Sequence, residues 1–178
     1  MIITTERSQS EQHLVDALRA TFDASVMNYG SYNILGTVDL LSVSEAETSP
    51  GVRTGAGSGE GSLLLVGYRR EPVEIVLCPV DLDEALGRAR ALRRGEGASP
   101  AAASIPTLVN LTNLAGMATH DNLVELKLST GRRVQLDLHG HVRFKEFPDI
   151  VLQQRKDVED FYEFIDYFMD TVEQMDAA

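Results

Sequence analysis

Residues 157–175, which read DVEDFYEFIDYFMDTVEQM, decide how this chain folds. Apolar side chains recur there at alternate spacings of three and four residues, at Val158, Phe161, Ile165, Phe168, Val172 and Met175. That spacing draws one apolar stripe down an α-helix. Residues 157–178 also hold eight acidic residues and neither Lys nor Arg. We therefore expect a long C-terminal helix that packs its stripe on the rest of the fold and presents an anionic outer surface.

Three further aromatic residues lie beside the centre of that stripe, at Tyr162, Phe164 and Tyr167. An apolar surface wider than one packed helix needs, next to many acidic residues, is typical of a partner-binding groove or a homodimer contact. The alternative is that flanking residues such as 141–155 cover these rings within the monomer. We take Tyr162, Phe164 and Tyr167 as candidate partner-binding residues.

Length and composition favour one folded domain over residues 1–178. The hydrophobic content of 43% and the charged content of 24% are ordinary for a globular protein. The net charge of −11 argues against nucleic acid as a partner and against stable membrane association. Because Cys78 is the single cysteine and the N-terminus has no secretory signature, we expect a cytoplasmic protein.

The N-terminal third predicts a helix followed by strands and a loop. Ser8 and Glu11 have capping-box spacing, and the helix that they begin should end near Asp23. Residues 25–43 predict a short strand, a turn and a longer strand that Gly36 bends or bulges. The Gly- and Ser-rich residues 44–61 predict a flexible loop, and the less favoured alternative is a phosphate-binding loop.

The middle of the chain predicts a buried hairpin and a second helix. SLLLVGY (62–68) and PVEIVLC (72–78) are dense in aliphatic residues, so at least one of these strands should be covered on both faces. Cys78 then reads as a small core residue. Asp81 caps a helix over 82–94, whose four arginines (Arg88, Arg90, Arg93 and Arg94) suit a solvated surface or, alternatively, an anionic partner. Residues 95–104 predict a second flexible connection.

The last third predicts a further hairpin. Residues 105–117 carry both strand-like and helix-like spacing, and we favour a strand over 105–112. Residues 122–128 and 132–139 alternate apolar and polar side chains around Thr130-Gly131, which indicates a hairpin with one buried face. Residues 141–155 read as an irregular connection that docks Phe144, Phe147, Ile150 and Leu152 onto the core.

The predicted fold class is α+β, with an antiparallel sheet of about six to seven strands, an N-terminal helix, a mid-chain helix and a long C-terminal helix on the sheet. GSLLLVGYRREPVEIVLCPV (61–80), NLVELKLSTGRRVQLDL (122–138) and DVEDFYEFIDYFM (157–169) together resemble a pleckstrin-homology or GRAM-like domain. The resemblance implies a sheet closed by the C-terminal helix. The helix over 82–94 departs from that family, and so does the absence of a Lys/Arg cluster in an early loop.

Candidate small sites were weighed against ordinary surface roles. His139 and His141 form an HxH pair that needs a third ligand, such as His120 or Asp137, and exposed histidines at a strand end are the favoured reading. Glu125 and Asp137 suit acid–base chemistry only if they face each other across the hairpin. Four arginines at two turns are the candidate anion-binding residues: Arg69, Arg70, Arg132 and Arg133.

No catalytic motif names a reaction. The leading hypothesis is therefore a non-enzymatic binding or adaptor module with a protein partner or a homodimer contact, and without cofactor or metal. One alternative is a dimer similar to small acidic secretion chaperones, which share the order of helix, sheet, helix, sheet and helix. The other alternative is an enzyme or small-ligand protein whose residues converge only in three dimensions.

Overall fold

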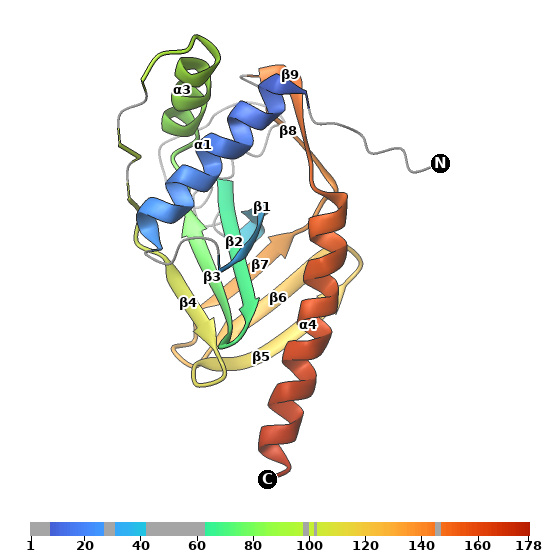
Figure 1. Ribbon diagram of the computed structural model, residues 1–178. Coiled ribbons are helices and arrows are strands. Elements are labelled where there is room, and N and C mark those ends of the chain that lie inside the picture. Colours follow the sequence, from blue (N-terminus) through green and yellow to red (C-terminus); the bar gives the residue numbers. More distant parts are fainter. Residues whose placement is uncertain (1–7, 27–30, 42–62, 98–99, 102, 145–146) are drawn as a thin grey trace, which may run out of the picture.

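The computed structural model describes residues 8–26, 31–41, 63–97, 100–101, 103–144 and 147–178, and it has the predicted α+β architecture (Figure 1). Its helices are α1 (Gln9–Ser25), α3 (Leu82–Arg93) and α4 (Arg155–Asp176). A seven-stranded antiparallel sheet has the order β4-β3-β2-β1-β7-β6-β5. Its strands are β1 (Asn33–Asp39), β2 (Leu63–Arg70), β3 (Val73–Pro79), β4 (Thr107–Asn110), β5 (Leu114–His120), β6 (Leu123–Leu128) and β7 (Arg133–Asp137). A two-stranded sheet pairs β8 (His141–Phe144) with β9 (Phe147–Gln153).

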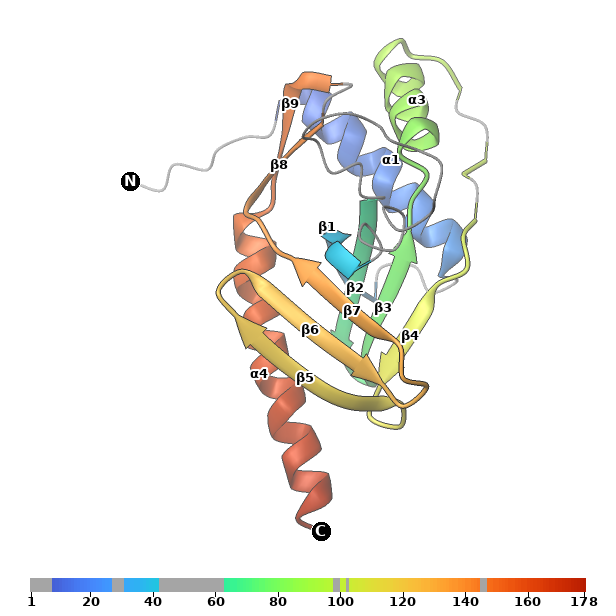
Figure 2. The same cartoon turned by 180° about the vertical axis from the view of Figure 1, so that it is seen from behind.

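The large sheet is strongly curved. Strands β4 and β5 stand at its two opposite edges, yet only residues 111–113 separate them in the chain. The Asn113 side-chain amide donates to the carbonyl of Leu108 at 2.7 Å and holds this tight turn. The sheet must therefore bend round until its two edges meet at the turn, and α4 lies across the side that the bend encloses (Figures 1 and 2).

Both faces of the central strands are covered, which explains their unbroken apolar sequence. Along β2, Leu64, Val66 and Tyr68 point into a core shared with α4. The alternate residues Leu63 and Leu65 point into a second core, shared with α1, α3 and the β8–β9 sheet. Because neighbouring side chains in a strand point to opposite faces, a run without polar residues fills two cores at once.

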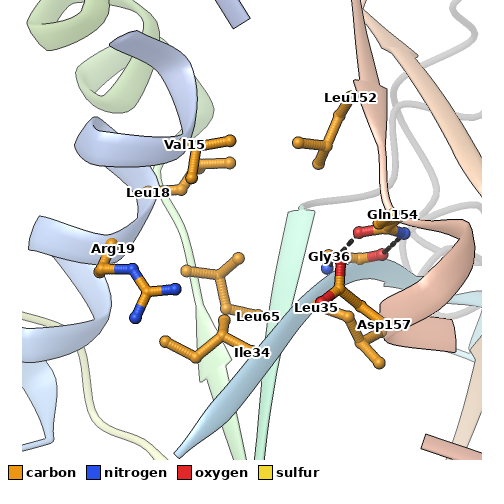
Figure 3. A pocket seen from close by; sticks show the side chains of 10 residues that line it. All are labelled: Val15, Leu18, Arg19, Ile34, Leu35, Gly36, Leu65, Leu152, Gln154 and Asp157. Carbon is orange, nitrogen blue, oxygen red and sulfur yellow. Dashed lines mark hydrogen bonds between the residues drawn. The ribbon is translucent and has the colours of Figure 1, made fainter. Parts of the chain in front are cut away.

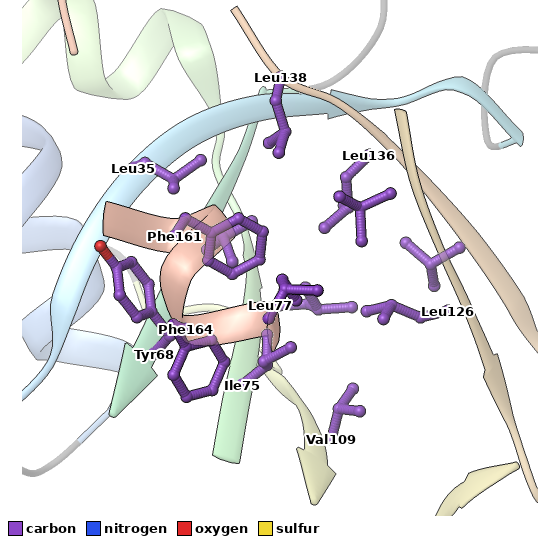
Figure 4. Close-up of a cluster of buried hydrophobic side chains, with 14 of the residues drawn as sticks. Leu35, Tyr68, Ile75, Leu77, Val109, Leu126, Leu136, Leu138, Phe161 and Phe164 are labelled. Carbon is purple, nitrogen blue, oxygen red and sulfur yellow. The ribbon is translucent and has the colours of Figure 1, made fainter. Parts of the chain in front are cut away.

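The core under α4 is built around stacked aromatic rings. Phe161, Phe164 and Phe168 are each at most 1% exposed. The Tyr68 ring of β2 lies 5.1 Å from the ring centroids of both Phe161 and Phe164. Figure 4 shows the rings of Tyr68, Phe161 and Phe164 among aliphatic side chains from the curved sheet. The predicted role of the helix as a lid on the sheet is confirmed for this part of α4.

The two predicted helix caps are present. The Ser8 hydroxyl accepts a hydrogen bond from the Glu11 backbone N–H at 3.2 Å, and the Asp81 carboxylate accepts one from Glu84 at 3.0 Å. The Glu11 side chain is 2% exposed and accepts from the backbone N–H of Gln153 at 2.8 Å. It therefore ties α1 to β9. Helix α1 also runs to Ser25, two residues beyond the predicted end near Asp23.

The prediction for residues 141–155 was wrong in part. Residues 141–144 and 147–153 form β8 and β9, although Phe144, Ile150 and Leu152 do pack in the core as expected, and the Phe147 side chain lies outside the described part of the structure. The favoured strand over 105–112 is present as the shorter β4, and a further strand, β5, follows it. The sequence of β5 is rich in Ala, Gly and Met, which have little preference for strands, so its pairing with β6 decides its conformation.

Among the remaining predictions, the two hairpins are confirmed and the bulge at Gly36 is wrong. The β2–β3 and β6–β7 hairpins form as expected, with Gly131 at φ 91° in the second turn. Strand β1 pairs with β2 in continuous register through Gly36, so the bulge expected there is absent. The described residues of 95–104 that follow Gly95 belong to no helix or strand, and the loop over 44–61 lies outside the described residues. No helix in the described ranges combines the length and apolarity needed to cross a membrane.

Candidate partner-binding groove

The predicted anion-binding arginines are held by separate partners. Arg69 donates from Nε to the Glu74 carboxylate at 2.7 Å, and its guanidinium lies 4.5 Å from the centre of the Tyr32 ring. The Tyr32 hydroxyl donates to the same carboxylate at 2.5 Å. Burial, followed by the hydrogen bond to Glu74, raises the pKa of Tyr32 to about 12. Arg69 is thus part of a buried network that joins β2, β3 and Tyr32.

The other three arginines are also engaged. Arg70 lies over the Tyr167 ring of α4, 5.0 Å from its centre. Arg132 donates to the Thr107 hydroxyl at 2.7 Å, and Arg133 pairs with Glu125. Arg69 and Arg70 line one hollow beside α4, which neither Arg132 nor Arg133 lines. The structure therefore does not gather the four side chains into one site, and anion binding stays a prediction.

The histidine and carboxylate candidates do not assemble into a reactive site. The His139 ring nitrogen Nε2 lies 2.9 Å from Asp137, and both side chains are partly exposed. Asp137 stands opposite Leu123 in the register, whereas Glu125 stands opposite Gln135, so the two carboxylates do not face each other. Within the described part of the chain, no three His, Cys, Asp or Glu residues are placed to hold a metal ion.

Cys78 is a core residue, as predicted. Its side chain is 0% exposed, and its sulfur lies 3.3 Å from the Ser104 hydroxyl oxygen. Of the arginines on α3, Arg88 pairs with Glu84 at 2.6 Å, and Arg94, just after the helix, pairs with Glu96 at 2.8 Å. Arg90, Arg93 and Arg94 are exposed, in line with the favoured prediction of a solvated surface, whereas the Arg88 side chain is only 8% exposed and departs from it.

A small cavity lies between α1, β1 and the start of α4 (Figure 3). Its volume is about 70 Å³, room for a few water molecules and well below the roughly 300 Å³ at which small-molecule sites begin. Gln154 closes one side. Its amide accepts from the Gly36 N–H at 2.8 Å and donates to the Gly36 carbonyl at 2.7 Å. Gln154 thus pairs with β1 as a neighbouring strand would, and the cavity reads as a structural void.

The three aromatic residues beside the stripe of α4, Tyr162, Phe164 and Tyr167, do not form an open surface. The prediction that Phe164 is a partner-binding residue is wrong, because its ring is 1% exposed and packs between Tyr68 and Phe168. The curved sheet encloses more of the helix than one flat face would. The Tyr162 hydroxyl donates to the Asp121 carbonyl at 3.0 Å. Burial, and then the charges of Asp137 and Asp121, raise the pKa of Tyr162. Tyr167 is 38% exposed but carries Arg70 on its ring.

The uncovered apolar surface lies further along α4. The C-terminal end of α4 projects past the sheet (Figures 1 and 2). Along the stripe, Phe168 is the last buried residue, and Val172 and Met175 after it are half-buried and exposed. Met169 is 36% exposed and Met175 is 57% exposed. They face the β4–β5 turn and the first half of β5 across a groove of about 330 Å³. Its apolar lining is Leu111, Leu114, Met117, Met169, Val172 and Met175, and we call it the β5–α4 groove.

The β5–α4 groove is bordered by acidic groups and by an open strand edge. Glu173 and Asp176 line it, and no basic residue stands in the last turn of α4. A helix C-terminus carries a partial negative charge, so acidic side chains there add to an already unfavourable field. Strand β5 is the last strand of the sheet and pairs with β6 alone among the described strands. Alternate N–H and C=O groups along its outer edge are therefore available to a ligand.

The sequence indicated some of the residues that line the β5–α4 groove. Val172 and Met175 lie on the predicted stripe, and Met169 lies one position beyond Phe168. The stripe was expected to be buried along its whole length, because periodicity gives the face of a helix but not the width of the sheet beneath it. All three methionines of the described ranges, Met117, Met169 and Met175, line the groove.

Comparison with known proteins finds no matching family model, no matching curated protein and no matching solved structure. Function is therefore inferred from the groove and its surroundings.

Proposed function

We propose that the protein is a non-enzymatic binding module that holds a segment of a partner protein in the β5–α4 groove. The observation that carries this proposal is the apolar stripe of α4, which continues past the core to Val172 and Met175. Exposed apolar side chains that face one another across a hollow lose their contact with water when a partner fills it. The proposal moves the predicted partner-binding surface from Phe164 to the next turns of the same helix.

The surroundings of the groove support a peptide segment as the occupant. The volume of about 330 Å³ has room for a few partner side chains. Beside it, the open edge of β5 offers backbone hydrogen bonds over Gly116 to His120, where pairing with β6 is regular. Side-chain anchors beside a strand edge are a recurrent arrangement in peptide recognition.

The wider setting that we propose follows from fold and composition. A curved seven-stranded sheet enclosing the C-terminal helix supports the resemblance to pleckstrin-homology or GRAM-like domains. The net charge of −11 supports a protein partner over nucleic acid. The single buried cysteine suits a reducing compartment such as the cytoplasm.

The proposal is tested by selecting a random-peptide display library on the immobilised full chain. Met169→Asp/Met175→Asp places charge in the groove without touching the core, since both side chains are exposed. Ile105→Asp is the matched control, because Ile105 is 90% exposed and does not line the groove. We expect the wild type and Ile105→Asp to enrich the same peptides, and the double variant to enrich none of them.

Two outcomes contradict the proposal. One is enrichment that survives Met169→Asp/Met175→Asp, which places binding elsewhere. The other is no enrichment above the bare support. Thermal unfolding of all three proteins, with midpoints within a few degrees, ensures that loss of binding is not loss of fold.

A further inference from the structure

We infer that the segment held in the β5–α4 groove is cationic, with Lys or Arg flanking its apolar anchors. The partner's charge matters only if the groove binds a segment at all, so this inference rests on the proposed function. Its support comes from the charge of α4, from the position of the groove at the end of that helix and from the methionines that line it.

Acidic residues run along the whole of α4, and two of them lie at the groove. Residues 157–178 carry eight acidic and no basic residues, out of a net charge of −11 for the whole protein. Glu173 and Asp176 line the groove itself, and both are exposed. A cationic segment in the groove would therefore meet carboxylates at its rim, where charge governs encounter rate and partner choice.

The end of α4 lacks the positive charge that its dipole calls for. Helices are stabilised by Lys, Arg or protonated His in the last turn, and α4 has none there. Its terminal carbonyls and its carboxylates thus add their negative potentials at one place. A Lys or Arg of the partner at this position would interact favourably with the helix dipole, as a basic residue in the last turn of α4 would have done.

The same charge disfavours a second copy of the chain as the occupant. Two α4 helices in contact would bring their acidic faces within about 8 Å, the distance over which physiological salt screens charge. Each face would carry several carboxylates, and neither helix has a Lys or Arg after position 156. Like charges juxtaposed in this way oppose association.

The apolar lining indicates tolerance in the anchors. Met117, Met169 and Met175 line the groove together with Leu114 and Val172. Methionine side chains are unbranched and polarisable, so a surface made of them adapts to anchors of different shape. Selectivity should accordingly rest more on the charge of the segment than on one particular apolar residue.

The test uses the peptides that the display selection enriches. We expect them to carry net positive charge, and a synthetic copy should bind with a Kd that rises with salt. Glu173→Gln/Asp176→Asn should raise that Kd roughly fivefold, because two exposed ion pairs are lost. Asp16→Asn/Glu96→Gln is the matched control, since it makes the same change in net charge at exposed sites outside the groove. We expect the control to leave the Kd unchanged.

The outcomes separate the two proposals. Groove-dependent peptides that are neutral or acidic overturn the cationic partner and leave the binding module intact. An equal rise in Kd for both double variants also overturns it, because overall charge would then explain binding. A dimer in light scattering that Met175→Asp dissociates identifies a second copy as the occupant and overturns it as well. Failure to enrich any groove-dependent peptide removes the proposed function itself.

Discussion

Gly67 has a hydrogen atom where other residues have a Cβ, and this lets α1 pack closely against the central strand β2. A Cβ at this position would lie 2.4 Å from Cζ and 2.7 Å from Cε2 of the Phe22 ring. Phe22 is 1% exposed and packs edge-on against Tyr32, with 5.6 Å between ring centroids, so its ring has little room to move. The second core therefore depends on the absence of one methyl group.

We predict that Gly67→Ala lowers the free energy of unfolding by about 1–3 kcal/mol, the usual cost of overpacking a core. Gly87→Ala is the matched control. Gly87 lies within α3, where nothing stands within 4 Å of its missing Cβ, so alanine should stabilise the helix by about 0.5–1 kcal/mol. Urea denaturation of both variants checks the pair, and a Gly67→Ala protein as stable as the wild type contradicts the packing described here.

Because the phenol of Tyr32 is buried, the free energy of unfolding should fall as the pH rises through the alkaline range. Its pKa is raised from 10.0 in the unfolded chain to about 12 in the fold. The unfolded state therefore loses this proton first as the pH rises. The contribution of Tyr32 is fully present below pH 10 and is lost progressively between pH 10 and about 12.

We predict that Tyr32→Phe unfolds more easily than the wild type at pH 8 and that the difference narrows above pH 10. Tyr68, whose pKa burial also raises, is present in both proteins, so the difference between them isolates Tyr32. The measurement is the free energy of unfolding from urea titrations between pH 8 and pH 11. Parallel pH profiles for the two proteins would show that Tyr32 does not titrate differently in the fold.

At the scale of elements, α4 has an inner part that stabilises the fold and an outer part that does not. Phe168 is 0% exposed within the aromatic core, whereas Met175 on the same stripe is 57% exposed. We predict that Phe168→Ala costs about 3–5 kcal/mol of unfolding free energy. Met175→Ala should change it by less than about 0.5 kcal/mol. Similar costs at both positions, measured by chemical denaturation, would mean that the outer turns are buried and the groove is closed.

The sequence predicted the elements whose signal is local. The cap residues Ser8 and Asp81 mark the helix starts, and the unbroken apolar runs of β2 and β3 mark strands covered on both faces. Strand β5 was missed because its Ala- and Gly-rich sequence becomes a strand only through pairing with β6. Strand β8 was missed because it has only four residues, and β9 was missed because its apolar residues Ile150, Val151 and Leu152 are consecutive and do not alternate with polar ones.

The candidate site was less predictable for a related reason. Phe164 was expected at the surface, and its burial depends on how far the sheet curves around α4. That curvature is a property of the whole sheet, set where residues 111–113 join its two edges. The stripe of α4 gave the correct face of the helix, but the place where the core ends could not be read from periodicity.

At the scale of the whole molecule, the proposed binding site adjoins the core under α4, against which Leu111, Leu114 and Met117 pack, and lies away from the second core. The second core, between the sheet and α1, α3 and the β8–β9 sheet, does not include any groove residue. Residues 157–178 carry eight of the acidic residues, which leaves a net charge of about −3 on the remainder from the total of −11. The uncovered end of the apolar stripe lies with Glu173 and Asp176 at the end of α4 furthest from the second core, and the other acidic residues run along the rest of the helix (Figure 1).

Methyl NMR of methionine tests the central claim most directly, because Met117, Met169 and Met175 all line the β5–α4 groove. Their ¹³C-methyl signals can be assigned through single Met→Leu variants and followed as a selected cationic peptide is added. The account predicts that all three signals shift together along one saturable binding curve. The Kd fitted to that curve should equal the Kd measured by titration. Saturable binding of the peptide that leaves these three signals unmoved would contradict it.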